Sequence, residues 1–190
     1  MSLELWSTVA SVGTFVVIAA TAIAAVIQLR HMRASNQITI LNDLRKATED
    51  EQFREAIEFI YTLPSRVQSS EFRAKLQGVR LPRDVYPIGL VGRLYETLGS
   101  YVNRGMLDAD LVCDLWAPVV FGHWEDMADA IVVMRRTRGP ELFENFEYLA
   151  CISKRYLDRS VSVYPKGLPR IAPEDKWAAE DLCGRVTPTQ

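Results

Sequence analysis

The chain has 190 residues, of which 48% are hydrophobic and 24% charged, and its formal net charge is -2. This near-neutral charge excludes a general nucleic-acid binder, which needs a strongly basic surface. After one apolar N-terminal segment is set aside, about 160 residues remain, enough for a single domain with its own core.

The N-terminal segment carries no charge between Glu4 and Arg30. As a helix, the uncharged window 5–29 is about 37 Å long, more than the roughly 30 Å hydrocarbon core of a bilayer requires. A buried core helix rarely runs so far without charge. A cleaved signal peptide is the sharper alternative, because Ala22-Ile23-Ala24 resembles a cleavage site. However, no positive residue precedes the apolar run, and the run is too long for a signal core. We therefore predict an uncleaved transmembrane helix.

The orientation of this helix follows from the flanking charges. Arg30, Arg33, Arg45 and Lys46 follow the apolar run, whereas only Glu4 precedes it. Positive residues stay inside, so we expect the N-terminus outside and the remaining chain on the cytoplasmic side of the inner (plasma) membrane. The expected parts are an anchor (1–29), a helical cytoplasmic domain (30–159) and a proline-rich tail (160–190). The residues assigned to the membrane interface are Trp6, Arg30, His31 and Arg33.

Small residues recur in the anchor at four-residue spacing, a pattern that lets membrane helices approach closely and form dimers. The pairs are Ser7 with Ser11, Ala10 with Thr14, and Ala20 with Ala24. Three cysteines, Cys113, Cys151 and Cys183, are far apart and form no paired motif, so we expect reduced thiols, the first two buried.

Apolar residues at three- and four-residue spacing continue beyond Arg30, so the first helix is expected to extend into the cytoplasm. A capping box at 48–51 predicts the start of a second helix, with Phe53, Ile57, Ile60 and Tyr61 on one side and its end at Pro64. Ser69 or Ser70 is expected to cap a short helix over 71–77.

Further helices are predicted at 88–103, with Gly105 just past its end, and from a cap at Asp108 through 115. Pro118 is expected to restart or kink that helix, which continues over 119–134. Gly139-Pro140 breaks it, and Pro140 is expected to open a last amphipathic helix. No segment alternates with a period of two, so the predicted fold is all-α, a helical bundle behind the anchor. In the tail, residues 173–182 are compatible with a short helix.

One cluster resembles a catalytic or metal site: His123, Glu125, Asp126 and Asp129. Glu125 and Asp129 lie four apart on one helix face, and His123 and Asp126 three apart on another. A metal site needs three or four ligands, and the chain has only two histidines. We interpret the cluster as a solvated acidic face beside a packed His123, and expect no metal, no cofactor and no enzymatic activity. An acid/base pair remains the alternative.

Polar residues also fall among core aromatics in two predicted helices. Tyr95 and Glu96 belong to one of them, and Asn145 and Glu147 to the other. Buried polar groups between helices must find partners, so we expect these four residues to form one structural network between helices.

Four motifs together resemble a bacterial family of small membrane-anchored proteins that has only a domain-of-unknown-function label. They are the segment leaving the anchor (28–37), an acidic-Phe-Arg-Glu-Ala stretch (51–56), Tyr-Glu-x-Leu-Gly (95–99) followed by Gly-x-Leu-Asp (105–108), and Asn-Phe-Glu-Tyr-Leu-Ala (145–150). The resemblance covers most of residues 5–157. It implies the anchored helical architecture and assigns no activity.

We therefore expect a protein-interaction or oligomerisation module at the cytoplasmic face of the membrane, binding a protein partner or itself and no nucleic acid. One alternative is a membrane effector of stress or phage defence that acts by oligomerising. A less favoured alternative is an enzyme or metal protein that uses the His123 region.

Overall fold

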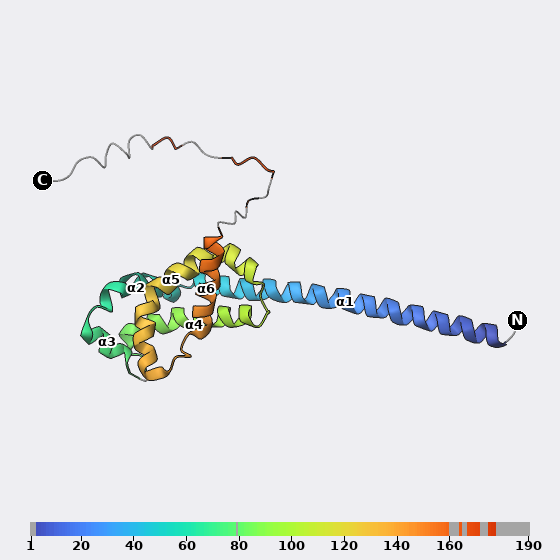
Figure 1. The fold of residues 1–190 in the computed structure, drawn as a ribbon, viewed down its shortest axis with the longest axis horizontal. Coiled ribbons are helices and arrows are strands. Elements are labelled where there is room, and N and C mark those ends of the chain that lie inside the picture. Colours follow the sequence, from blue (N-terminus) through green and yellow to red (C-terminus); the bar gives the residue numbers. More distant parts are fainter. Residues whose placement is uncertain (1–2, 79, 160–163, 165–166, 172–174, 178–190) are drawn as a thin grey trace. The chain divides into compact units, whose positions relative to one another are not determined.

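The computed structural model describes residues 3–78, 80–159, 164, 167–171 and 175–177, and the chain divides into two compact units, 1–160 and 161–190. The described residues form six α-helices and one short 3-10 helix and contain no strand (Figure 1). The prediction of an all-α fold is therefore confirmed. The short helix predicted at 173–182 falls largely outside the described residues.

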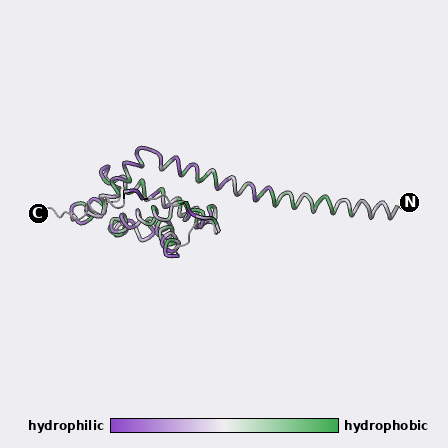
Figure 2. The backbone as a smooth tube through the Cα atoms, turned by 90° about the horizontal axis from the view of Figure 1, so that it is seen from above, coloured by the Kyte–Doolittle hydropathy of each residue, from purple (hydrophilic) through white to green (hydrophobic). Residues whose placement is uncertain are grey.

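Helix α1 (Leu3–Glu49) is one continuous helix of 47 residues, about 70 Å long. The prediction that the helix continues beyond Arg30 is confirmed. Its N-terminal part is long and apolar enough to cross a bilayer, and no residue of its most apolar window is buried. Figure 2 shows the tube changing from white and green to purple along α1. At the opposite end Leu44 is buried in the core of the bundle, and Ile40 and Leu41 pack against that core.

Helix α2 (Glu51–Arg66) is capped by Asp50, whose side chain accepts a hydrogen bond from the Gln52 amide. The capping box predicted from Thr48 is wrong, because the Thr48 hydroxyl instead bonds the Arg45 carbonyl at the end of α1. Pro64 does not end α2 but lies inside its last turn. Ser69 caps α3 (Ser70–Leu76), as predicted.

The second half of the unit begins with the short helix η1 (Arg83–Val85), followed by α4 (Tyr86–Asn103), α5 (Ala109–Arg138) and α6 (Glu144–Asp158). Asp108 caps α5 by accepting from the Leu111 amide, as predicted. Pro118 does not interrupt α5.

Helix α6 begins later than predicted, at Glu144 rather than Pro140. Its N-cap, Phe143, has a left-handed backbone (φ 59°) and supplies no side-chain cap. A bulky residue rarely adopts this conformation. Here the Phe143 ring is buried against Gly92 of α4, where an added Cβ would lie 2.5 Å from the ring. Burial of the ring compensates for the backbone strain and sets the start of α6.

The core lies where α2, α4, α5 and α6 meet. Helix α6 packs along both α4 and α5, and α2 packs against α4 and α5 on another side. The largest fully buried side chains come from all four helices and include Ile60, Ile88, Met127 and Phe146. This packing fixes the inner faces of α2, α4 and α5, which carry the candidate site.

Candidate functional site

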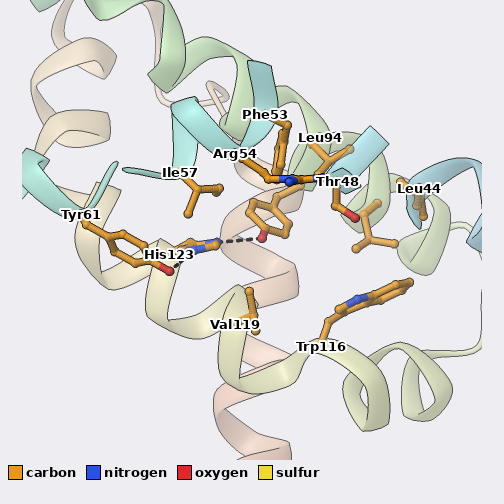
Figure 3. Close-up of a pocket in the computed structure, with 12 residues that line it drawn as sticks. Leu44, Thr48, Phe53, Arg54, Ile57, Tyr61, Leu94, Trp116, Val119 and His123 are labelled. Atoms are coloured by element: carbon orange, nitrogen blue, oxygen red, sulfur yellow. Dashed lines mark hydrogen bonds between the residues drawn. The ribbon is translucent and has the colours of Figure 1, made fainter. Parts of the chain in front are cut away.

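His123 lies in the middle of α5 with only 5% of its surface exposed. Its Nδ1 atom is 2.8 Å from the hydroxyl of Tyr95 on α4, and its Nε2 atom is 3.4 Å from the hydroxyl of Tyr61 on α2 (Figure 3). Which partner donates in each pair depends on the histidine tautomer. The imidazole thus connects three helices through two phenol groups.

Burial favours the neutral forms of His123 and Tyr95. Burial lowers the pKa of His123, and the nearby charge of Asp126 opposes that shift without reversing it. Burial also raises the pKa of Tyr95, with a smaller contribution from Tyr61. Near neutral pH the imidazole and the Tyr95 phenol are therefore both uncharged. Such a triad links α2, α4 and α5 through neutral His123 and Tyr95 side chains.

Of the acidic members of the predicted cluster, Asp126 lies near enough for its charge to act on His123, but Glu125 and Asp129 do not share its surroundings. Glu125 and Asp129 are exposed and Asp126 is half-buried, whereas His123 faces the core. The helical spacing that brings the acids to the surface carries the histidine inward. Across the described part of the chain, no three His, Cys, Asp or Glu residues are grouped so that they could hold a metal ion.

The four polar residues predicted as one network take part in three separate contacts. Glu96 accepts hydrogen bonds from the Asn145 side chain (2.7 Å) and the Phe146 amide (3.0 Å). Tyr95 bonds His123, and Glu147 pairs with Arg135 at 2.6 Å. Glu96 therefore serves as the cap that α6 lacks from its own N-cap residue.

A pocket of about 390 Å³ lies next to the triad, in the size range of small-molecule sites. Tyr61 lies at the edge of this pocket and is 63% exposed. It was predicted on the core side of α2, but the buried stripe of α2 is Phe53, Ala56, Ile60 and Leu63. The pocket is lined by Leu44 and Thr48 of α1; Phe53, Arg54, Ile57 and Tyr61 of α2; Leu94, Tyr95 and Leu98 of α4; and Trp116, Val119 and His123 of α5.

The remaining candidates lie apart from this pocket. Cys113 is buried, and burial raises the pKa of its thiol. Cys151 is exposed, so the prediction that it is buried is wrong: it lies on α6 one residue beyond the buried Leu149 and Ala150. Cys183 lies outside the described residues. Of the residues assigned to the membrane interface, Trp6, Arg30 and His31 are exposed, and the side chain of Arg33 is outside the described part.

These features define the class: an all-α protein in which one long apolar N-terminal helix leads into a packed helical bundle. Residues 15–153 match the family model described as Domain of unknown function (DUF4760), and the chain belongs to that family. The resemblance to a family of unknown function is thereby confirmed. No curated protein and no solved structure matches the chain.

Proposed function

We propose that this protein is a single-pass membrane protein whose cytoplasmic bundle self-associates beneath the bilayer. The unburied apolar part of α1 supports the membrane span, because that much apolar surface is stable in lipid and costly in water. The basic residues that follow it support a cytoplasmic bundle. From Leu29 to Leu44, α1 continues as a helix of roughly 22 Å, which holds the bundle away from the membrane.

The observation that carries self-association is an exposed apolar stripe on α5. Leu111, Leu115 and Val119 lie four residues apart on successive turns and are 37%, 53% and 48% exposed. The opposite face of the same helix, with Cys113 and Ala117, is buried. A stripe of this kind on an otherwise packed bundle is typical of an interaction surface. Confinement to one membrane raises the effective concentration of a second copy.

We expect Leu115→Glu to weaken self-association of the full-length protein at least tenfold, because it places a charge in the centre of the stripe. Val132→Glu is the matched control, since Val132 is 56% exposed on the same helix but outside the stripe. Native mass spectrometry of protein in lipid nanodiscs measures whole multiples of 21.5 kDa. A monomeric wild type, or equal assembly of both variants, would contradict self-association. If a second polypeptide co-purifies with the wild type and is lost only from Leu115→Glu, the stripe binds that polypeptide rather than a second copy of this chain.

The topology is tested with the exposed thiol of Cys151, in a Cys183→Ser background, since Cys113 is buried. In sealed right-side-out vesicles, a membrane-impermeant maleimide should leave Cys151 unlabelled until the vesicles are permeabilised. A Ser2→Cys variant should be labelled before permeabilisation. Equal labelling of Cys151 in both conditions, or release of the protein by a carbonate wash, would count against the proposed span and its orientation.

The proposal assigns no reaction to the chain. The neutral His123 and Tyr95 side chains of the triad, and the separation of His123 from Glu125 and Asp129, support a binding role rather than catalysis.

A further inference from the structure

The pocket beside His123 lies where the end of α1 meets the bundle. Its walls come from four helices, and Figure 3 shows the Trp116 and Val119 side chains on one side and Ile57, Phe53 and Leu94 on the other. Several of these side chains are only partly covered, with Ile57, Leu94 and Trp116 half-buried and Val119 exposed. Apolar walls that remain open to solvent offer a favourable place for an apolar molecule to bury surface.

Polar groups lie at two places in this apolar pocket. The Tyr61 hydroxyl and His123 Nε2 share a long hydrogen bond of 3.4 Å, and the Thr48 hydroxyl and the Arg54 guanidinium belong to the α1–α2 junction. A few polar groups among apolar walls are what fixes the orientation of a bound ligand.

The charge on the residues that line the pocket is positive only. Arg54 is the one charged residue among the twelve that line the pocket, and no carboxylate is present among them. Its guanidinium donates one hydrogen bond, of 2.8 Å, to the Glu49 carbonyl, and within the described residues it forms no ion pair. Further N–H donors of this exposed side chain are therefore available to a planar anion. A cation bound here would lose hydration without meeting an opposite charge.

We propose that this pocket binds a small apolar molecule that carries one carboxylate, with the carboxylate paired to Arg54 and the apolar body between Ile57, Leu94, Trp116 and Val119. Such a ligand also contacts Leu44 and Thr48 of α1. Its binding therefore stabilises the packing of α1 on the bundle, because it adds contacts to both sides of that junction. Of the three stripe residues, only Val119 lines this pocket, and Leu111 and Leu115 do not.

The test uses a diazirine-bearing analogue of decanoic acid and its methyl ester, each added to the full-length protein in phosphatidylcholine nanodiscs. After illumination, labelled residues are located by peptide mass spectrometry. We expect the acid to label the pocket walls around Ile57 and Trp116, and an excess of unlabelled decanoate to abolish this labelling. Labelling within residues 5–29 reports partition into the bilayer and serves as an internal reference.

Three variants make the test specific. Arg54→Gln should raise the acid concentration needed for half-maximal labelling of the pocket about tenfold, as expected for loss of a charge-assisted contact. Val119→Trp should fill the pocket and abolish its labelling by the acid. Val132→Trp, at a similarly exposed position of α5 outside the pocket, should leave this labelling at the wild-type level. Thermal unfolding of each variant checks that the bundle is folded.

The proposal is overturned if the acid labels only the bilayer segment, or if Val119→Trp labels as strongly as Val132→Trp. Equal labelling by the methyl ester, or an unchanged concentration dependence for Arg54→Gln, overturns the assignment of a carboxylate ligand to Arg54.

Discussion

Gly99→Ala is expected to lower the free energy of unfolding by about 3 kcal/mol, the upper end of the usual cost of overpacking a core. A Cβ at this position of α4 would lie 2.6 Å from the Asn145 carbonyl carbon and 3.2 Å from the Asn145 Cβ on α6. The obstacle is backbone, which no side-chain rotation relieves, so α4 and α6 must separate. Their separation would also disturb the Glu96 cap and the ring contact of Phe143 with Gly92.

Gly122→Ala is the matched control for this substitution. Gly122 lies inside α5, and nothing lies within 4 Å of an added Cβ. Alanine there should stabilise the protein by about 0.5–1 kcal/mol, because glycine costs more conformational entropy in a helix. Urea unfolding of the full-length protein in detergent can be followed by Trp124, whose ring packs edge-on against Phe146 at 5.1 Å. Equal stability of the two variants would show that the close approach of α4 and α6 does not matter.

Glu96→Ala is expected to destabilise the bundle by about 2 kcal/mol, since hydrogen bonds to a charged group contribute roughly 1.5–3 kcal/mol. The half-buried carboxylate accepts from the Asn145 side chain and the Phe146 amide at the start of α6. Negative charge at a helix N-terminus is also favourable. Glu96→Gln should cost about half as much, because its carbonyl still accepts the Phe146 amide but its NH2 group cannot accept from Asn145.

The control for the Glu96 variants is Glu125→Ala on the exposed face of α5, where no hydrogen bond or ion pair involves Glu125 within the described residues. Its effect should stay within about 0.5 kcal/mol. The same urea titration measures all three variants. If Glu96→Ala falls within the range of Glu125→Ala, then α6 does not depend on a cap from α4.

Local signals in the sequence predicted most of the helices. The uncharged window over 5–29 and the amphipathic pattern beyond Arg30 predicted α1. The capping residues Ser69 and Asp108 predicted the starts of α3 and α5. Two prolines do not act on the helices as their local signals predict. Pro64 and Pro118 both lie inside helices, because tertiary packing compensates for the single hydrogen bond that each proline removes.

The candidate site was less predictable, because its partners are far apart in sequence. The sequence singled out His123 and placed Tyr95 in another helix, but periodicity does not reveal that the two side chains meet. It grouped His123 with Glu125, Asp126 and Asp129, which are neighbours along the chain but lie in different surroundings. The sequence placed Tyr61 on one side of the second helix and Arg54 in the motif at 51–56, but it did not indicate that they lie beside His123 and line one pocket.

The sequence by itself determined that this protein is all-α with one long apolar helix at its N-terminus, because helix formation and membrane-compatible hydrophobicity are properties of consecutive residues. Only the tertiary structure decided where α6 begins, which helix caps it and which side chains enclose the pocket. The contact of Gly99 with Asn145 and that of Gly92 with Phe143 join residues 46 and 51 positions apart. Such contacts depend on how closely packed helices approach each other, a distance that no pattern within a single helix specifies.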